Sequence, residues 1–365
     1  MFDKIIEPTL VIDKRKCLLN ISRMSGKANS HNLLFCPHFK THQSLLVGEW
    51  FHDLGITAIT VSSVSMAQYF GEAGWHDITI AFPLNPREIN RINEINPNVS
   101  LNLTVENPEA LGLAGQRLTR QVGVFIKIDT GYNRTGIRHS EFEKINVLLN
   151  NISRYNLTKF KGFLIHAGHT YQCSSENEVL DIHIDSLKKI KELKEYYQKA
   201  YPDLVISYGD TPSCSIAGDF TGIDEIRPGN FAYYDLMQVN IGSCSLNDIA
   251  VVVACPVVAK HPERKHIVLY GGAVHFSKEY YLENGRKVFG KSIKLDGSGL
   301  NHYPIEGTLI NLSQEHGILE LTDPIQFNQI QIGELVYILP VHSCLTANLL
   351  RSSFVQYDTN INPII

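Results

Sequence analysis

The 365-residue sequence predicts an α/β fold, in which a (β/α)8 barrel of the TIM type is followed by a smaller, β-rich C-terminal domain. Two observations predict this fold. In the first two-thirds of the chain, single strand-like segments alternate with helix-like segments, which is the pattern of parallel strands joined by crossover helices. Beyond Asp235, short β-like runs follow one another without long helices between them.

The first part of the chain contains eight strand-like segments. In order, they are LLFCPHFK (33–40), ITAITVSS (56–63), DITIAFP (77–83), VSLNLTV (99–105), VGVFIKID (122–129), FKGFLIHAG (160–168), LVISYGD (204–210) and EIRPGNF (225–231). The clearest helical patterns between them are PREINRINEI (86–95), EFEKINVLLNNI (141–152) and ENEVLDIHIDSLKKIKELKEYYQKA (176–200). Eight strand–helix units predict a closed barrel. A doubly wound open sheet is the alternative, although no GxGxxG follows the first strand.

The first of these strands ends in a lone lysine, Lys40. In extended backbone His38 and Lys40 share one face. A helix is expected to begin near Thr41, because apolar residues recur at helical spacing over residues 45–51. Lys40 therefore sits where a strand ends and a helix begins. A solvated surface lysine is the simplest interpretation of such a position.

The later part of the chain consists of β-like runs. They are IAVVVACPVVAK (249–260), KHIVLYGGAVHF (265–276), GTLINLS (307–313), GILELT (317–322) and ELVYILPVHS (334–343). We therefore predict a barrel domain over residues 1–245 and a β-rich domain over residues 246–365. Within residues 1–15, the strand-like TLVID fits either domain.

Composition excludes several classes of function. The formal net charge is −4 and no long basic run is present, which argues against nucleic acid and membrane partners. The apolar run 249–259 is too short to span a bilayer and contains Pro256. The first 13 residues have no long apolar core, so no signal peptide is expected. Seven cysteines without a CxxC pair indicate reduced thiols in the cytoplasm.

Polar and glycine residues gather where the predicted barrel strands end. The active site of such a barrel lies at the carboxyl ends of its strands. The candidates there are His38 and Lys40 after the first strand, Asp129 and Arg134 after the fifth, His166, Gly168, His169 and Tyr171 after the sixth, 209–213 after the seventh and 227–230 after the eighth.

The loops after strands seven and eight are where barrels of this kind commonly bind phosphate. Thr211 offers a hydroxyl there, while Gly209 and Gly229 let backbone amides approach an anion. Each loop taken singly is also compatible with an ordinary glycine turn. A lysine on one wall and a phosphate site on the other suggest pyridoxal phosphate, whose aldehyde reacts with a lysine amine.

The motifs PHFKTH, DTGYNRTG, HAGHTY, GDTP, EIRPGN and VHSC occur in this order along the chain. With this set of motifs the sequence resembles the D-serine dehydratase and D-threonine aldolase family. These are fold-type III pyridoxal phosphate enzymes, related to alanine racemase through the barrel. The resemblance implies a barrel plus a β domain, usually in a homodimer.

The resemblance also implies roles for individual residues. Lys40 looks like the lysine that forms the Schiff base, Arg134 like the arginine near the cofactor's phenolic oxygen, and Tyr171 like the residue beside the ring nitrogen. The residues that look like the phosphate site are Thr211, Gly229 and Asn230. His166 is expected at the barrel mouth, either in contact with the cofactor ring or as a packed core histidine.

The late motif VHSC places His342 and Cys344 two residues apart at the end of a strand-like run. In extended backbone both side chains would face one side. Imidazole and thiolate together suit zinc, although a buried cysteine beside a surface histidine is the simpler interpretation of HxC alone. By resemblance this is the dehydratase-type pair, with zinc expected and manganese the alternative. The aldolases more often carry aspartate in place of Cys344.

The expected activity is elimination from a D-3-hydroxy amino acid such as D-serine, giving an oxo acid and ammonia. The alternatives are D-threonine aldolase-type retro-aldol cleavage, an amino-acid racemase, a non-catalytic pyridoxal phosphate carrier, and a metal-binding barrel without this cofactor. The sequence departs from the family at Cys36, where arginine is typical, at Gln43, where lysine is typical, and at YGGAVHF (270–276), which replaces an acidic segment. These departures leave the substrate open.

Overall fold

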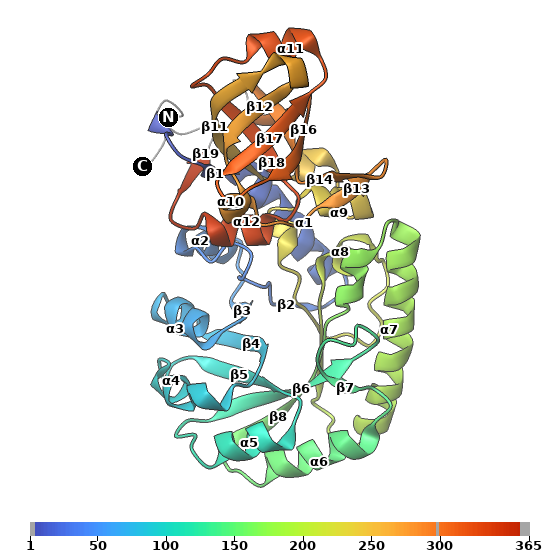
Figure 1. The fold of residues 1–365 in the computed structure, drawn as a ribbon. Coiled ribbons are helices and arrows are strands. Elements are labelled where there is room, and N and C mark those ends of the chain that lie inside the picture. The colour runs from blue at the N-terminus through green and yellow to red at the C-terminus, as the bar shows by residue number, and fades with distance from the viewer. Residues whose placement is uncertain (1–3, 297–298, 358–365) are drawn as a thin grey trace. The chain divides into compact units, whose positions relative to one another are not determined.

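The computed structural model describes residues 4–296 and 299–357 (Figure 1). The chain forms two compact units. The barrel unit comprises residues 22–229, and the β unit comprises the described residues up to Ile21 and from Asn230 onward. The division thus falls after Gly229, whereas the sequence suggested a boundary near residue 245.

The barrel unit is built on a nearly closed ring of parallel strands. In spatial order these are β2 (Leu34–Phe35), β10 (Glu225–Ile226), β9 (Val205–Tyr208), β8 (Thr158–Ile165), β6 (Val122–Asp129), β5 (Ser100–Val105), β4 (Asp77–Pro83) and β3 (Ala58–Val61). The short strand β7 (Ile137–Arg138) pairs with β6 off this path. Seven of the eight fall within the predicted segments, and β8 begins two residues before its segment, so the predicted barrel is confirmed.

The ring closes between β2 and β3, the two ends of this order, through the chain that follows β2. His38 forms an isolated parallel bridge with Thr60 of β3. The backbone N–H of Phe39 donates to the Thr60 carbonyl at 2.9 Å, and the Thr60 N–H donates to the Pro37 carbonyl at 2.9 Å. The buried Thr60 hydroxyl also donates to the Cys36 carbonyl at 2.9 Å. This closure excludes the open doubly wound sheet.

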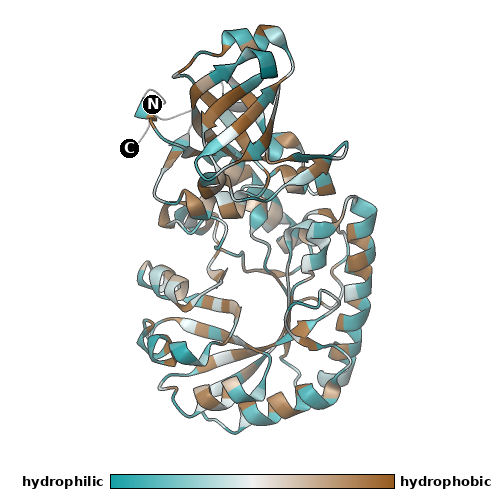
Figure 2. Ribbon diagram, viewed as in Figure 1, coloured by the Kyte–Doolittle hydropathy of each residue, from teal (hydrophilic) through white to brown (hydrophobic). Residues whose placement is uncertain are grey.

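Helices connect the strands and lie outside the ring (Figure 1). They are α1 (Lys14–Ser30), which crosses the division between the units, α2 (Leu45–Asp53), α3 (Val64–Glu72), α4 (Ile89–Glu94), α5 (Pro108–Gly115), α6 (Phe142–Ser153), α7 (Glu176–Tyr197) and α8 (Thr211–Ile216). In Figure 2 the barrel strands are mostly hydrophobic, whereas the helices carry both hydrophobic and hydrophilic residues. This is the amphipathic pattern expected of helices that cover a buried sheet.

Side chains that cap the helices explain several of their starts. Ser44, Ser63, Asn107, Ser175 and Asp210 each accept a hydrogen bond from a backbone amide in the first turn of the helix that follows. Such caps satisfy amides that have no partner within the helix. The cap at Ser44 places the start of α2 at Leu45, later than the predicted start near Thr41.

The β unit contains an antiparallel β-barrel. The strands β12 (His266–Tyr270), β17 (His316–Leu321), β16 (Gly299–Leu312), β15 (Gly290–Asp296), β18 (Leu335–Pro340) and β11 (Val251–His261) pair in this order, and β11 pairs again with β12. On the other side of β11, β1 (Thr9–Asp13) pairs antiparallel with it and parallel with β19 (Phe354–Tyr357). The N-terminal strand thus belongs to this sheet.

Shorter elements complete the β unit. They are the hairpin β13 (Tyr281–Glu283) and β14 (Arg286–Val288) and the helices α9 (Leu236–Ile241), α10 (Ala273–Phe276), α11 (Pro324–Gln329) and α12 (Ser343–Leu349). Along the part of the chain that the structure describes, no helix combines the length and apolar character needed to cross a membrane.

An aromatic cluster packs beneath the end of the first barrel strand. Phe39 is fully buried and contacts Trp75, Phe51 and Phe70 with ring centroids 4.9–5.0 Å apart. Such packing contributes both buried apolar area and edge-to-face ring contacts. The cluster therefore fixes the backbone that leads to Lys40.

Phe39→Ala should lower the free energy of unfolding of the barrel unit by about 3–5 kcal/mol, because it leaves a cavity among rings. Both tryptophans of the chain, Trp50 and Trp75, are buried in this unit, so the urea midpoint of their fluorescence reports its stability. Phe82→Ala, at a ring that is 62% exposed on β4, is the control and should shift the midpoint little. Equal shifts for both variants would contradict this account of the cluster.

Asp210 caps α8 from a buried position, with its carboxylate accepting from the Ser213 N–H at 2.7 Å and the Thr170 hydroxyl at 3.0 Å. Burial raises the pKa of Asp210 to about 6, against the opposing effect of these hydrogen bonds. Because this pKa lies above the ordinary value of 3.8, the carboxyl contributes stability at low pH that is lost as the pH rises through about 6.

Asp210→Asn, which keeps a capping oxygen, should therefore gain stability relative to the wild type between about pH 4 and about pH 7. The gain should be on the order of 2–3 kcal/mol. Urea denaturation of both proteins across this range measures it. Parallel pH profiles for the two proteins would show that the carboxyl does not titrate in this way.

Candidate active site

Hydrogen bonds fix the backbone of the segment that carries Lys40. The Lys40 N–H donates to His38 Nδ1 at 3.3 Å, and the Gln43 side chain donates to the Lys40 carbonyl at 3.3 Å. Gln43 has a φ of 50°, in the left-handed region, and its N–H donates to the Phe39 carbonyl at 3.0 Å. A non-glycine residue held in this region marks a turn fixed by its surroundings. The exposed Lys40 side chain thus projects from a fixed turn.

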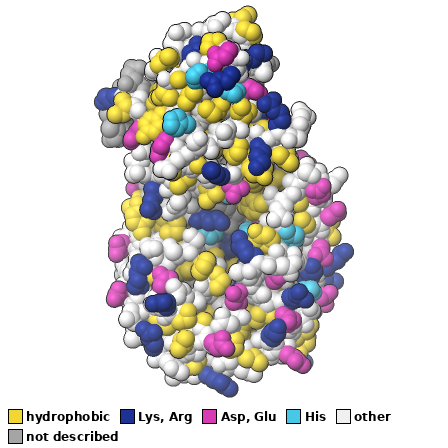
Figure 3. Space-filling model, in the orientation of Figure 1, with side chains coloured by type: hydrophobic (Ala, Val, Ile, Leu, Met, Phe, Trp, Pro, Cys, Tyr) yellow, Lys and Arg dark blue, Asp and Glu magenta, His cyan; other side chains and the backbone are white. Residues whose placement is uncertain are grey.

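The barrel mouth is rich in cations and neutral imidazoles. Burial lowers the pKa of His166 well below its ordinary value, and Lys127, Lys40 and Arg134 lower it further. Burial and the charge of Lys40 likewise lower the pKa of His38 well below its ordinary value. Figure 3 shows Lys, Arg and His side chains around a hollow in the barrel unit. Such surroundings favour an anionic ligand, and the phosphate of a cofactor is one.

Lys127 is a further candidate site residue, which the sequence analysis missed. It lies on β6 and is 4% exposed. Burial lowers its pKa well below the ordinary value, and Arg227 and Arg134 add to this effect, whereas Glu106 opposes it. A lysine within the apolar run VGVFIKID was the available signal, since a charged residue rarely occupies a buried strand.

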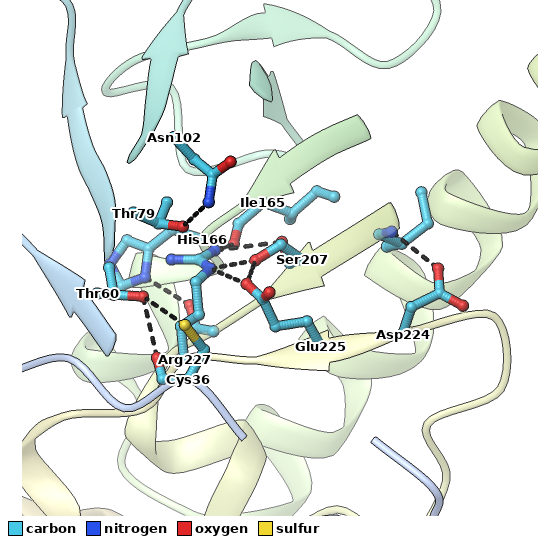
Figure 4. Close-up of polar contacts among 12 residues, drawn as sticks. Cys36, Thr60, Thr79, Asn102, Ile165, His166, Ser207, Asp224, Glu225 and Arg227 are labelled. Atoms are coloured by element: carbon cyan, nitrogen blue, oxygen red, sulfur yellow. Dashed lines mark hydrogen bonds and ion pairs between the residues drawn. The ribbon is translucent and has the colours of Figure 1, made fainter. Parts of the chain in front are cut away.

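Arg227 ties together the ends of three strands beneath the mouth. Its guanidinium donates to the Ile165 carbonyl at 2.6 Å and to the Ser207 carbonyl at 3.2 Å, and lies 3.8 Å from the Glu225 carboxylate. Figure 4 shows the side chain directed into this group. Ile165 precedes His166, whose Nδ1 lies 2.6 Å from the Gly209 carbonyl. The network thus fixes the loops that carry the candidate site residues.

Arg134 lies in a loop organised by the carboxylate that ends β6. Asp129 accepts from the Gly131 N–H at 2.9 Å and from the Asn133 N–H at 3.1 Å. The Arg134 guanidinium lies 4.9 Å from the centroid of the Tyr132 ring, a cation–π geometry. The Tyr132 ring therefore helps to hold Arg134, the arginine predicted to contact the cofactor, in place.

The predicted ring and phosphate residues of the barrel unit are neighbours. The Thr211 N–H donates to the Tyr171 hydroxyl at 3.0 Å, and the Tyr171 ring lies 6.3 Å from that of His166. A Cβ atom on Gly229 would lie 2.7 Å from the His38 carbonyl oxygen, so no side chain fits there. The structure thus brings the loops of strands six, seven and eight to the end of the first strand.

The remaining predicted residues, Asn230, His342 and Cys344, meet in the β unit. Asn230 Nδ2 donates to Cys344 Sγ at 3.6 Å. Burial lowers the pKa of His342, but the hydrogen bond and charge of Cys344, with Asp235 and Glu279, raise it to about 9. Imidazole and thiol therefore lie in contact, as a shared metal would require.

The expected conformation of this pair was wrong. Strand β18 ends at Pro340, His342 precedes α12 with φ −132° and ψ 98°, and Cys344 lies in the first turn of that helix. The side chains converge across a helix start and not along one face of a strand. Among the described residues, no group of three or more His, Cys, Asp or Glu side chains could hold a metal. A metal here would take its other ligands from water or substrate.

Comparison with known proteins shows which families and enzymes this chain resembles. Residues 12–236 match the alanine racemase N-terminal domain, and residues 250–356 match a family described as "Putative serine dehydratase domain". The D-serine dehydratase of Dictyostelium discoideum is 27% identical over 366 residues, which cover 93% of this chain and 91% of that protein. The D-threo-3-hydroxyaspartate dehydratase of Delftia sp. (strain HT23) is 26% identical over 350 residues, with coverage of 93% and 91%.

The structure of the Delftia enzyme superposes with a TM-score of 0.88 at 23% identity, covering 99% of this chain and 97% of that chain. A Cys-to-Ala mutant of D-threo-3-hydroxyaspartate dehydratase, solved in a metal-free form, gives a TM-score of 0.86 at 24% identity, with coverage of 97% and 95%. The alanine racemase domain match spans more than half of the chain. The protein is therefore a member of the D-serine dehydratase and D-threonine aldolase family, the fold-type III pyridoxal phosphate enzymes with an alanine racemase N-terminal domain.

Proposed function

We propose that the protein is a pyridoxal phosphate- and metal-dependent lyase that eliminates water from a D-3-hydroxy amino acid such as D-serine, giving an oxo acid and ammonia. The contact between His342 and Cys344 is the observation that carries this proposal. Its support includes two dehydratase relatives that each align over 93% of the chain. From the family resemblance we infer a homodimer, which sedimentation of the active enzyme would test. From the seven cysteines without a CxxC pair we infer a cytoplasmic location.

The residues at the barrel mouth fit pyridoxal phosphate. Lys40 offers an exposed amine, Arg134 supplies positive charge, Lys127 offers a buried amine, and Thr211 begins helix α8 just after β9. The bound cofactor would supply an electron sink for the electron pair left on the substrate α-carbon. Lys40 would hold the cofactor's aldehyde carbon between turnovers and, when displaced by the substrate amine, would remove the α-proton.

The pair in the β unit fits a divalent metal. His342 offers an imidazole nitrogen and Cys344 a half-buried thiol. A thiolate ligand favours zinc over manganese. A metal held there would supply Lewis-acid chemistry for hydroxide, which is a poor leaving group. In support, the solved mutants of D-threo-3-hydroxyaspartate dehydratase change a histidine and a cysteine two residues apart, the same spacing as in this chain.

The products separate this activity from its rivals. Elimination from D-serine yields an oxo acid and ammonia, retro-aldol cleavage of D-threonine yields glycine and an aldehyde, and racemisation yields the L enantiomer. Incubating the enzyme with D- and L-serine, D- and L-threonine and their 3-hydroxyaspartate counterparts, followed by product identification, tests the proposal. Formation of glycine alone would replace it with the aldolase.

Lys40→Ala should abolish the visible absorbance of the bound cofactor and lower turnover by at least about 10²-fold, because the amine serves both as the cofactor's attachment and as the base. Lys144→Ala, at a lysine with a 67% exposed side chain on α6, is the control and should retain both properties. Borohydride reduction followed by peptide mapping locates the modified lysine. A reduced adduct on a different lysine would contradict the assignment.

Treatment with a strong chelator should abolish elimination while leaving the cofactor absorbance intact, and zinc should restore turnover. Cys344→Ala should act like the chelator, because it removes one of two protein ligands. Cys255→Ala is the control, since Cys255 is a buried thiol on β11 of the same unit. Full turnover after complete removal of metal would refute the metal-dependent mechanism and favour a racemase if the product is the L enantiomer.

A further inference from the structure

Ser343, the residue between His342 and Cys344, is anchored by a carboxylate from another element. Asp235 Oδ2 accepts from the Ser343 N–H at 2.9 Å and from the Ser343 hydroxyl at 3.2 Å. Asp235 and Ser343 are 1% and 0% exposed. Hydrogen bonds to a buried charged acceptor are strong, so this contact fixes the peptide that joins the two candidate ligands.

Asn230 also links Asp235 Oδ2 to Cys344. Asn230 Nδ2 donates to Asp235 Oδ2 at 2.6 Å, to Ser343 Oγ at 3.1 Å and to Cys344 Sγ at 3.6 Å. Asn230 is 4% exposed, so this bridge is buried as well. The sulfur is therefore oriented by an amide that Asp235 itself holds in place.

The two carboxylate oxygens of Asp235 have separate tasks. Oδ1 accepts from the Gln238 N–H at 3.0 Å and so caps α9, whereas Oδ2 receives the bonds from Ser343 and Asn230. An asparagine at this position could keep the cap through its carbonyl oxygen. Its NH2 group would then face donors and could accept none of their bonds.

We propose that Asp235 is a positioning residue that sets the separation and orientation of His342 and Cys344 through Ser343 and Asn230, and thereby sets the affinity of the pair for a divalent metal. The inference rests on the proposed function, because it assumes that these two side chains are the protein's metal ligands. Residues that orient metal ligands commonly contribute about 10- to 100-fold to metal affinity.

The test is a titration of the full-length, metal-free enzyme with Co²⁺ in competition with a chromophoric chelator. The near-ultraviolet band of thiolate-bound cobalt reports ligation by sulfur. Asp235→Asn should weaken cobalt binding by about 10- to 100-fold and diminish this band. Asp323→Asn is the matched control, because Asp323 likewise caps a six-residue helix, α11, of the β unit. It should bind cobalt like the wild type.

The outcomes distinguish the inference from the proposed function. Wild-type binding by Asp235→Asn, or equal weakening by Asp323→Asn, overturns the positioning role and leaves the lyase proposal standing. A wild-type enzyme that binds no cobalt and eliminates water from D-serine without metal overturns both. If Asp235→Asn does not fold, Ser343→Ala decides. It removes the hydroxyl with its bonds to Asp235 and Asn230, keeps the backbone bond to Asp235, and should weaken cobalt binding several-fold. Unchanged binding by this variant overturns the inference.

Discussion

The candidate site of the barrel unit depends on one contact, the closure of the parallel ring between His38 and Thr60. Because β2 is only two residues long, the following residues complete the ring through backbone bonds to Thr60. The last of these bonds is made by Phe39, the residue directly before Lys40. These bonds also bring the first strand's end against Gly229, which has no room for a side chain. The lysine and the loop after the eighth strand are neighbours for this reason.

A second constraint is the burial of charge inside the ring. Arg227 and Glu225 are 4% and 3% exposed, so both lose their hydration. Their mutual attraction offsets part of that cost, and bonds to Ile165 and Ser207 satisfy the guanidinium. Burial lowers the pKa of Arg227 and raises that of Glu225. Buried ion pairs contribute little net stability. The main effect of this pair is therefore to fix the positions of the strand ends.

Much of this arrangement follows from the sequence because it depends on local pattern. The eight strand-like runs alternate with helical ones, and the rule for strand ends in barrels then selects Lys40, Arg134 and His166. The conformation of His342 and Cys344 could not be obtained in this way. Within the apolar run LVYILPV, Pro340 alone marks where pairing stops, and Ser343 is the only further signal that helix α12 follows. Lys127 was missed, and Arg227 was named only as part of the loop at residues 227–230, because the neighbours of both come from distant strands.

The sheet of the β unit pairs segments that lie far apart in the sequence. Strand β1 lies between β11 and β19, so residues 10–13 pair with residues 354–357, which are synthesised much later. The barrel unit, in contrast, is one uninterrupted stretch from Ser22 to Gly229. On the ribosome its strands can all emerge while β1 still lacks both neighbours, and domains generally fold as units during synthesis. The topology therefore implies an order of assembly. The barrel unit can fold before the sheet of the β unit closes around β1.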